Sequence, residues 1–96
     1  MITLSQESFA AARSYIMTHG RPLDQARFIH HFENGEPALV FQELAAFQNE
    51  DGGFGNALEP DIRTPASSAI ATSTGLTILR EAGAKGDEPL VIAALR

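Results

Sequence analysis

The chain has 96 residues, of which 44% are hydrophobic and 20% are charged, and its formal net charge is −5. This composition is typical of one small globular domain rather than of a disordered segment. Cysteine is absent and no cluster of Lys and Arg occurs, which excludes disulfides, thiolate metal sites and the basic footprint of a nucleic-acid-binding protein.

No segment of the chain has the character of a membrane span or an export signal. The uncharged stretch 64–79 is too short and too rich in Ser and Thr to cross a bilayer. Residues 1–7 lack the basic and apolar regions of a signal peptide. We therefore expect a cytoplasmic protein without a transmembrane segment.

Two amphipathic helices are predicted at the start of the chain. The first runs from about residue 5 to residue 19, with Thr3 or Ser5 as its N-cap and Gly20 at its end. Its apolar face comprises Phe9, Ala12, Ile16 and Met17. The second covers about 23–33, and its apolar stripe comprises Ala26, Ile29 and Phe32, with Phe28 beside it.

A third helix and a long loop follow. Glu36-Pro37 opens the helix, because proline in the first turn loses no hydrogen bond, and Val40, Leu44 and Phe47 form its buried stripe. The loop 48–63 contains three glycines and one proline, which rule out a regular element. We expect a surface loop, and loops of this length often carry function.

The fourth predicted helix has an unusual composition. Thr64 as N-cap and Pro65 at the first position predict its start, and Gly83 ends it after Ala82. It carries no charge before Arg80, so we expect other helices to cover most of its sides. Its hydroxyl side chains either bond to the preceding turn or line a polar cavity. Glu88-Pro89 opens a fifth helix, expected to continue to residue 96.

One short pattern occurs twice. The residues EPALV at 36–40 and EPLVI at 88–92 each follow a glycine turn, and their starts are 52 residues apart. A period of this size is typical of arrays and rings of helix pairs. Together with the alternation of charged and uncharged helices, it predicts outer and inner helices of a ring. Residues 1–96 would then be a single N-terminal segment of a longer domain.

The end of the third helix supports this prediction by resemblance. Gln48, Gly52 and Phe54 resemble the QW motif of squalene-hopene and oxidosqualene cyclases, with Phe at the place where that family usually has Trp. The resemblance implies an all-α fold, in which helical hairpins form a segment of an α/α toroid of the terpenoid cyclase and protein prenyltransferase superfamily. It also implies a structural role for these three residues, which tie an outer helix to its neighbours.

A broader similarity covers about 23–82. The strings FE at 32–33, QNEDGGFG at 48–55, LEPD at 58–61 and TS at 72–73 are similar to a group of bacterial prenyltransferase-like toroid proteins that have no agreed reaction. The Asp-rich catalytic motif of the cyclases is missing from this chain, and so is the cysteine with which protein prenyltransferases hold zinc. The resemblance therefore implies no particular reaction, and we identify no cofactor.

Two carboxylates are the candidate catalytic residues. Glu59 and Asp61 flank Pro60 just before the uncharged helix, where they could act as a general acid and base or bind a cation. The alternative is that they cap the helix, complement its dipole or pair with Arg63. Both interpretations remain open from the sequence alone, and so does the question of whether the protein is an enzyme.

The glycine-rich loop and the helix after it supply candidate ligand-binding residues. Exposed backbone N–H groups around Asp51 and Gly53 could bind an anion or a sugar, although such strings are more often simple turns. The remaining candidates are Asn56, Ser68 and Thr72. No metal site is expected, because the adjacent His30 and His31 point about 100° apart on a helix.

Three functions are compatible with these observations. The chain could contribute to an enclosed cavity for a small substrate, either an isoprenoid or a carbohydrate as in toroid lyases and glycosidases. It could instead be a non-catalytic binding or scaffold module. Exposed inner-helix surface could also drive self-association.

Overall fold

The computed structural model describes residues 5–95, in which five helices follow one another. They are α1 (Gln6–His19), α2 (Pro22–Phe32), α3 (Pro37–Ala45), α4 (Ala69–Glu81) and α5 (Pro89–Ala94). The only β-type pairing in this range is an isolated bridge between Gln48 and Phe54, so the predicted all-α class is confirmed. Thr3 and Arg96 lie outside the described residues. None of the helices described is long and apolar enough to cross a membrane.

Local signals fix the starts of four helices. Ser5 is the N-cap of α1, where its hydroxyl accepts a hydrogen bond from the Ser8 N–H at 3.1 Å. Proline is the first residue of α2, α3 and α5, a position whose N–H has no partner inside the helix. These starts lie within one residue of the predicted ones.

The predicted start of α4 is wrong. The helix begins at Ala69 instead of Pro65, and its N-cap is Ser68, whose hydroxyl accepts from the Ala71 N–H at 3.0 Å. The preceding residues are held by the loop, since the Pro65 carbonyl accepts from the Asn56 N–H and the Ser68 N–H donates to the Phe54 carbonyl. These tertiary bonds compete with the helical conformation that the Thr-Pro pair predicts.

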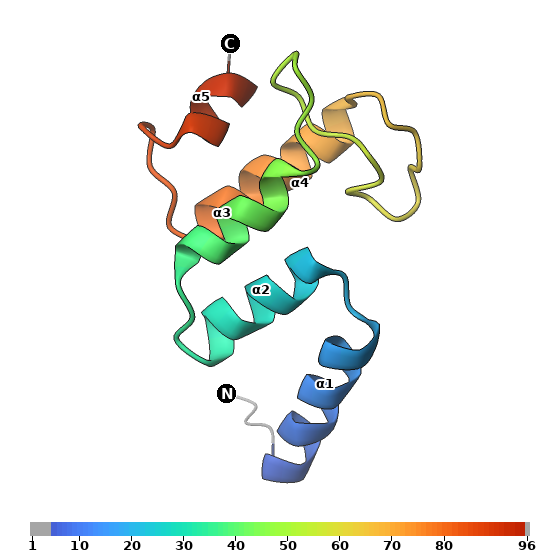
Figure 1. Ribbon diagram of the computed structural model, residues 1–96, viewed down its shortest axis with the longest axis vertical. Coiled ribbons are helices and arrows are strands. Elements are labelled where there is room, and N and C mark those ends of the chain that lie inside the picture. Colours follow the sequence, from blue (N-terminus) through green and yellow to red (C-terminus); the bar gives the residue numbers. More distant parts are fainter. Residues whose placement is uncertain (1–4, 96) are drawn as a thin grey trace.

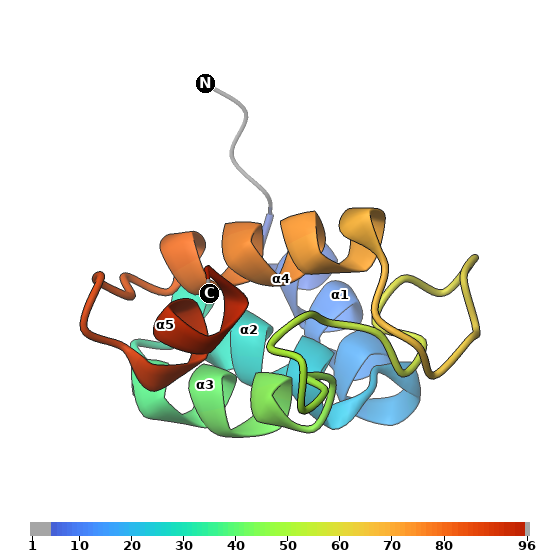
Figure 2. The ribbon, with the colours of Figure 1, turned by 90° about the horizontal axis from the view of Figure 1, so that it is seen from above.

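The helices form a row of neighbours in chain order. The main contacts join α1 to α2, α2 to α3, α3 to α4, and α4 to α5. Figure 1 shows α3 in front of α4, with α1 at one end of the molecule and α5 at the other, and Figure 2 shows α4 above α3 with α5 beside them. The architecture is thus two antiparallel hairpins, α2–α3 and α4–α5, preceded by α1.

The long loop 46–68 belongs to the core. Phe54 and Leu58 are 0% and 2% exposed, and they join one apolar cluster with Leu23, Val40, Leu44, Ala71, Ile78 and Leu79. The expectation of a surface loop is therefore wrong for these positions. Phe32, expected in the buried stripe of α2, is 61% exposed, because α2 turns Leu23, Ala26 and Phe28 inward.

Helix α4 is covered on one side. Ala71, Gly75, Ile78 and Leu79 are buried, whereas Ile70, Ser73 and Thr77 are exposed. The expectation that neighbours cover most of this helix is wrong within residues 5–95. Its lack of charge therefore does not follow from burial in this part of the chain.

Candidate functional site

The predicted ligand residue Asp51 lies at the exposed tip of the loop. Its Oδ1 atom accepts hydrogen bonds from the Ser67 hydroxyl at 2.7 Å and from the Gly53 N–H at 2.9 Å. These two bonds, the Ser67 bond first, lower the pKa of the Asp51 carboxyl below its ordinary value. Asp51 therefore stays ionised near neutral pH, and it fastens the loop tip to the segment before α4.

Two asparagines join the same part of the loop. The Asn49 amide donates to the Ser67 hydroxyl at 2.9 Å and to the Pro65 carbonyl at 3.0 Å. The Asn56 amide donates to Asn49 Oδ1 at 3.0 Å and to the Phe47 carbonyl at 3.3 Å. Asn49 was not among the sequence candidates, yet it connects both halves of the loop. In the sequence, Asn49 can be recognised only as an amide residue in a predicted turn, and nothing there indicates its contacts.

Ser68, Thr72 and Gly53 are also engaged by the backbone around them. Ser68 caps α4, and the Thr72 hydroxyl accepts from the Phe54 N–H at 3.0 Å. A Cβ atom at Gly53 would lie 2.8 Å from the Ser67 side chain. The five predicted ligand residues thus gather in one region, where each side chain or backbone group already has an intramolecular partner or neighbour.

The QW-like residues make tertiary contacts. The Gln48 Nε2 atom donates to the Gly52 carbonyl at 2.9 Å and to the Leu90 carbonyl of α5 at 3.0 Å. Gly52 has a φ of +87°, and a Cβ there would overlap the Ala93 carbonyl of α5. The Phe54 ring is buried against Gly75, where a Cβ would lie 2.6 Å from the ring. These three residues connect the end of α3 to α5 and to α4.

The structure separates the environments of the two candidate catalytic carboxylates. Glu59 is half-buried, and its Oε1 atom accepts a hydrogen bond from the Thr74 hydroxyl of α4. Asp61 is exposed, and no ion pair within residues 5–95 joins Arg63 to either carboxylate. Neither residue caps α4, since that helix begins eight residues beyond Asp61. The cap and the Arg63 pair are therefore wrong, since Ser68 is the N-cap of α4, whereas a contribution of these carboxylates to the helix dipole stays a prediction.

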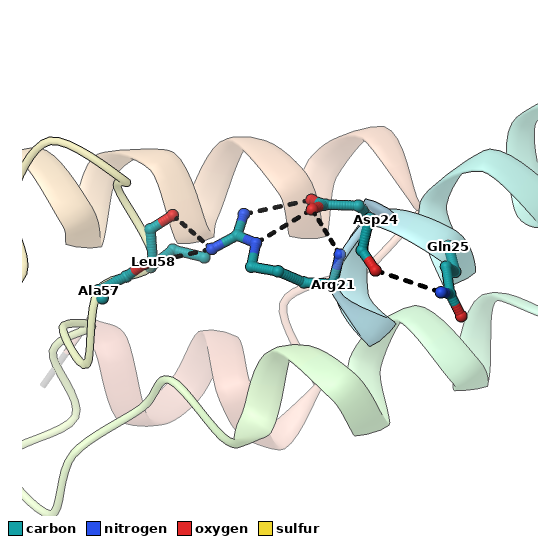
Figure 3. Close-up of polar contacts among 6 residues, drawn as sticks. Arg21, Asp24, Gln25, Ala57 and Leu58 are labelled. Atoms are coloured by element: carbon teal, nitrogen blue, oxygen red, sulfur yellow. Dashed lines mark hydrogen bonds and ion pairs between the residues drawn. The ribbon is translucent and has the colours of Figure 1, made fainter. Parts of the chain in front are cut away.

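Arg21 is a further residue of this region that sequence reasoning did not single out. Figure 3 shows its guanidinium between the Asp24 carboxylate and the backbone of the loop. Its Nη1 atom donates to the Ala57 and Leu58 carbonyls at 3.2 and 3.1 Å, and its Nε atom donates to Asp24 at 3.0 Å. The guanidinium also lies 5.4 Å from the centre of the Phe47 ring. Because its backbone partners are 36 and 37 residues away, no local pattern indicates this role.

The backbone that Arg21 holds is strained. Asn56 and Ala57 have φ values of +56° and +63°, a conformation that side chains with a Cβ disfavour. At the other end of the contact, burial raises the pKa of the Asp24 carboxyl, but hydrogen bonds from the Arg21 side chain and N–H outweigh this, and the net pKa is lowered. An ionised pair thus fixes the turn that precedes Glu59.

The loop tip stands between two surface hollows. One, of about 330 Å³, is lined by Glu50, Asp51, Gly52, Pro89, Ile92 and Ala93. The other, of about 550 Å³, is lined by Asn49, Glu50, Asp51, Pro65, Ala66 and Ser67. Among residues 5–95, no group of three or more His, Cys, Asp or Glu side chains is arranged to hold a metal ion.

Fold and site together define a class, an all-α protein of helical hairpins braced by a partly buried, glycine-rich loop. Comparison with known proteins adds no relative to this description. No family model, curated protein or solved structure matches the chain.

Proposed function

We propose that this chain is a non-catalytic binding module, in which the loop braces the helical hairpins and the module presents surfaces to a partner. The observation that carries the proposal is the engagement of the loop's polar groups. Asp51, Asn56 and Thr72 each make hydrogen bonds within the loop or to α4. Polar groups that already have hydrogen-bond partners indicate a structural role for the loop, because a ligand would have to replace those bonds.

A ligand screen by thermal stabilisation, followed by turnover assays with every hit, tests this function. We expect ligands that raise the melting temperature and are recovered unchanged. Turnover of any hit, abolished in Glu59→Gln while the melting temperature is kept, would contradict the proposal.

A second candidate is an enzyme whose cavity wall includes α4, with an isoprenoid or a carbohydrate as substrate. It is favoured by Glu59, a half-buried carboxylate hydrogen-bonded to Thr74, and by the hydroxyls of Ser73 and Thr77 on the exposed side of the same helix. In this proposal Glu59 is the catalytic group, and Asp61 assists from the surface. Comparing Glu59→Gln with Asp61→Asn separates the two roles, since loss of turnover in the first alone assigns catalysis to Glu59.

We also propose that the two hairpins are an arc of an α/α toroid of the terpenoid cyclase and prenyltransferase type. The order of helix contacts supports this arrangement, as does the Gln48 bond from the end of α3 to α5. In an arc, the rotation that takes α2 onto α4 also takes α3 onto α5. An experimental structure in which these two rotations differ in direction would contradict the toroid.

A further inference from the structure

The hollow between α1 and α2 combines apolar and ionisable side chains. Figure 1 shows these two helices next to each other at the end of the molecule opposite α5. The hollow has a volume of about 200 Å³ and is lined by Ile16, Asp24, Arg27, Phe28, His31 and Phe32. Three of these six residues are apolar and three are ionisable, so one surface offers both kinds of contact.

Phenylalanine rings form the apolar part of the hollow. The ring centres of Phe28 and Phe32 lie 5.0 Å apart, and the Phe9 ring of α1 lies 5.6 and 6.0 Å from them. Phe32 is nevertheless 61% exposed. Helix α1 brings Ile16 to the hollow but has no buried residue of its own. The contact between α1 and α2 thus leaves apolar area accessible beside the ionisable groups.

The Arg27 guanidinium uses few of its N–H donors. Within residues 5–95 its one hydrogen bond runs from Nη2 to Glu81 Oε2 of α4 at 3.3 Å, longer than the about 2.7–2.9 Å of a typical charge-assisted bond. Its Nε atom is buried and has no partner in this range, which costs free energy. The His31 Nε2 atom lies 3.8 Å from the same Glu81 oxygen, beyond hydrogen-bond distance. Glu81 therefore holds both side chains weakly.

The ionisable residues indicate which kind of molecule covers the hollow. Within residues 5–95 no polar or charged side chain is buried, so the helices described pack through apolar residues and glycine. A polypeptide helix over the hollow would bury Asp24, Arg27 and His31 together, which is unfavourable unless each gains a partner. A small molecule with one anionic group and an apolar remainder avoids that burial.

The sign of the charge follows from the existing pairs. The Asp24 carboxylate already accepts hydrogen bonds from the Arg21 guanidinium at 3.0 and 3.2 Å. The weakly paired charge that lines the hollow is the cation of Arg27. An anionic group therefore complements this surface better than a cationic one.

We propose that this hollow binds a small organic monocarboxylate whose apolar part is an aromatic or alkyl group. The carboxylate replaces Glu81 at the Arg27 guanidinium, whose planar fork suits two parallel hydrogen bonds, and the apolar part packs on Phe28 and Phe32. The hollow is smaller than the about 300–1,000 Å³ of pockets for drug-sized ligands, which favours a small molecule. The inference rests on the proposed binding function and names its ligand class.

An NMR titration of the intact, ¹⁵N-labelled chain with 3-phenylpropionate tests the inference. Two ligands are controls: 3-phenylpropylamine carries the opposite charge on the same apolar part, and acetate lacks the apolar part. We expect 3-phenylpropionate alone to shift the Arg27 Nε–Hε signal and the amide signals of residues 24–32, with a Kd that rises with salt. Equal binding of either control ligand, or shifts confined to other residues, would overturn the inference.

Two substitutions separate ligand binding from the contact between α2 and α4. Arg27→Gln should weaken 3-phenylpropionate binding about tenfold, because it removes the charged donors. Glu81→Gln should instead tighten binding, because it removes the carboxylate that competes for the guanidinium. If Arg27 served only to join the helices, both variants would lower the melting temperature and neither would change the Kd. Arg80→Gln is the control, since Arg80 is exposed on α4 and does not line the hollow.

Phe32→Ala tests the apolar contact. We expect it to weaken 3-phenylpropionate binding about threefold or more. Tyr15→Ala is the matched control, because Tyr15 is an aromatic residue of α1 that is 67% exposed and does not line the hollow. Circular dichroism checks that all variants remain helical. The same Kd in Phe32→Ala and Tyr15→Ala would remove the aromatic surface from the site and overturn the inference.

The two proposals fail in different ways. If other ligands stabilise the protein without turnover but 3-phenylpropionate does not bind, the binding function stands and the assignment of this hollow falls. If turnover of any ligand is found while 3-phenylpropionate still binds at Arg27 and Phe32, the non-catalytic function falls and the assignment stands.

Discussion

At the scale of single residues, two kinds of contact hold the loop in place. The Phe54 ring fills the space above Gly75, and polar side chains fix the turns on either side of it. Arg21 shows how one side chain can do both, since its guanidinium binds Asp24 and two loop carbonyls while lying over Phe47. Substitutions at these residues should therefore change the stability of the protein more than their sequence context indicates.

Gly75→Ala should destabilise the protein although alanine is the better helix former. The new Cβ would lie 2.6 Å from Cδ2 of Phe54, whose ring is 0% exposed and has no room to move. We expect a loss of about 1–3 kcal/mol in the free energy of unfolding, measured by urea denaturation. Gly86→Ala is the control, because no atom beyond its chain neighbours lies within 4 Å of the new Cβ, and it should change stability little.

The Asp24 carboxyl should contribute a pH-dependent share of stability. Its pKa is lowered from 3.8 in the folded protein, so its contribution is fully present above the unfolded value and is lost as the pH falls through the folded one. We expect the urea midpoint of the wild type to fall on acidification below about pH 4, and to fall less in Asp24→Asn. Asp87→Asn, at an exposed site, should keep the pH dependence of the wild type. Identical curves for Asp24→Asn and the wild type would contradict the assignment.

At the scale of elements, prediction succeeded where the signal was local. Pro37 and Pro89 fix their helix starts through a restricted φ and a missing N–H, which depend on no distant residue. Pro22 does the same for α2, whose predicted start was one residue later. Prediction failed at α4, where Phe54 and Asn56 hold residues 65–68 in a non-helical conformation through tertiary bonds. The buried part of the loop was missed for a similar reason, because glycine-rich polar strings indicate a surface turn unless the packing is known.

For the candidate site, too, the sequence supplied only local signals. Asp51, Gly53, Asn56, Ser68 and Thr72 were selected by residue type, and they do lie in one region, but their hydrogen bonds were not predictable. Asn49 and Arg21 act over 16 to 37 residues of separation, which no spacing rule covers.

Ser68→Ala tests whether Ser68 is the N-cap of α4. Removal of the hydroxyl that accepts from the Ala71 N–H should cost about 1 kcal/mol in urea denaturation. Thr64→Ala should cost less, since Thr64 lies outside the helix and is exposed. The reverse order would place the start of the helix at the Thr-Pro pair after all.

At the scale of the whole molecule, a few long-range contacts join a row of helices that otherwise pack on their neighbours. Arg21 links the start of α2 to the loop, Arg27 pairs with Glu81 of α4 at 3.3 Å, and Gln48 reaches α5. The charged pairs are partly exposed and are expected to contribute little each. The Arg21 contact differs because it also satisfies two loop carbonyls.

Arg21→Met should therefore loosen the loop without melting the helices. The variant keeps an apolar chain over Phe47 but loses the charged hydrogen bonds to the Ala57 and Leu58 carbonyls. We expect a stability loss of about 2 kcal/mol, together with faster hydrogen exchange at amides 54–60. Arg63→Met, which removes an exposed arginine nearby, is the control. Unchanged exchange in Arg21→Met would show that the loop is held by its own contacts.

The bond from Gln48 to the Leu90 carbonyl has a consequence for synthesis on the ribosome. Most helix contacts here join segments adjacent in sequence, so α1, α2 and α3 can assemble while the rest of the chain is still being translated. The Gln48 amide must wait until residue 90 has left the exit tunnel. Until then the nascent chain carries its glycine-rich segment without this closing bond, and a translational pause just before α5 would prolong its exposure to proteases.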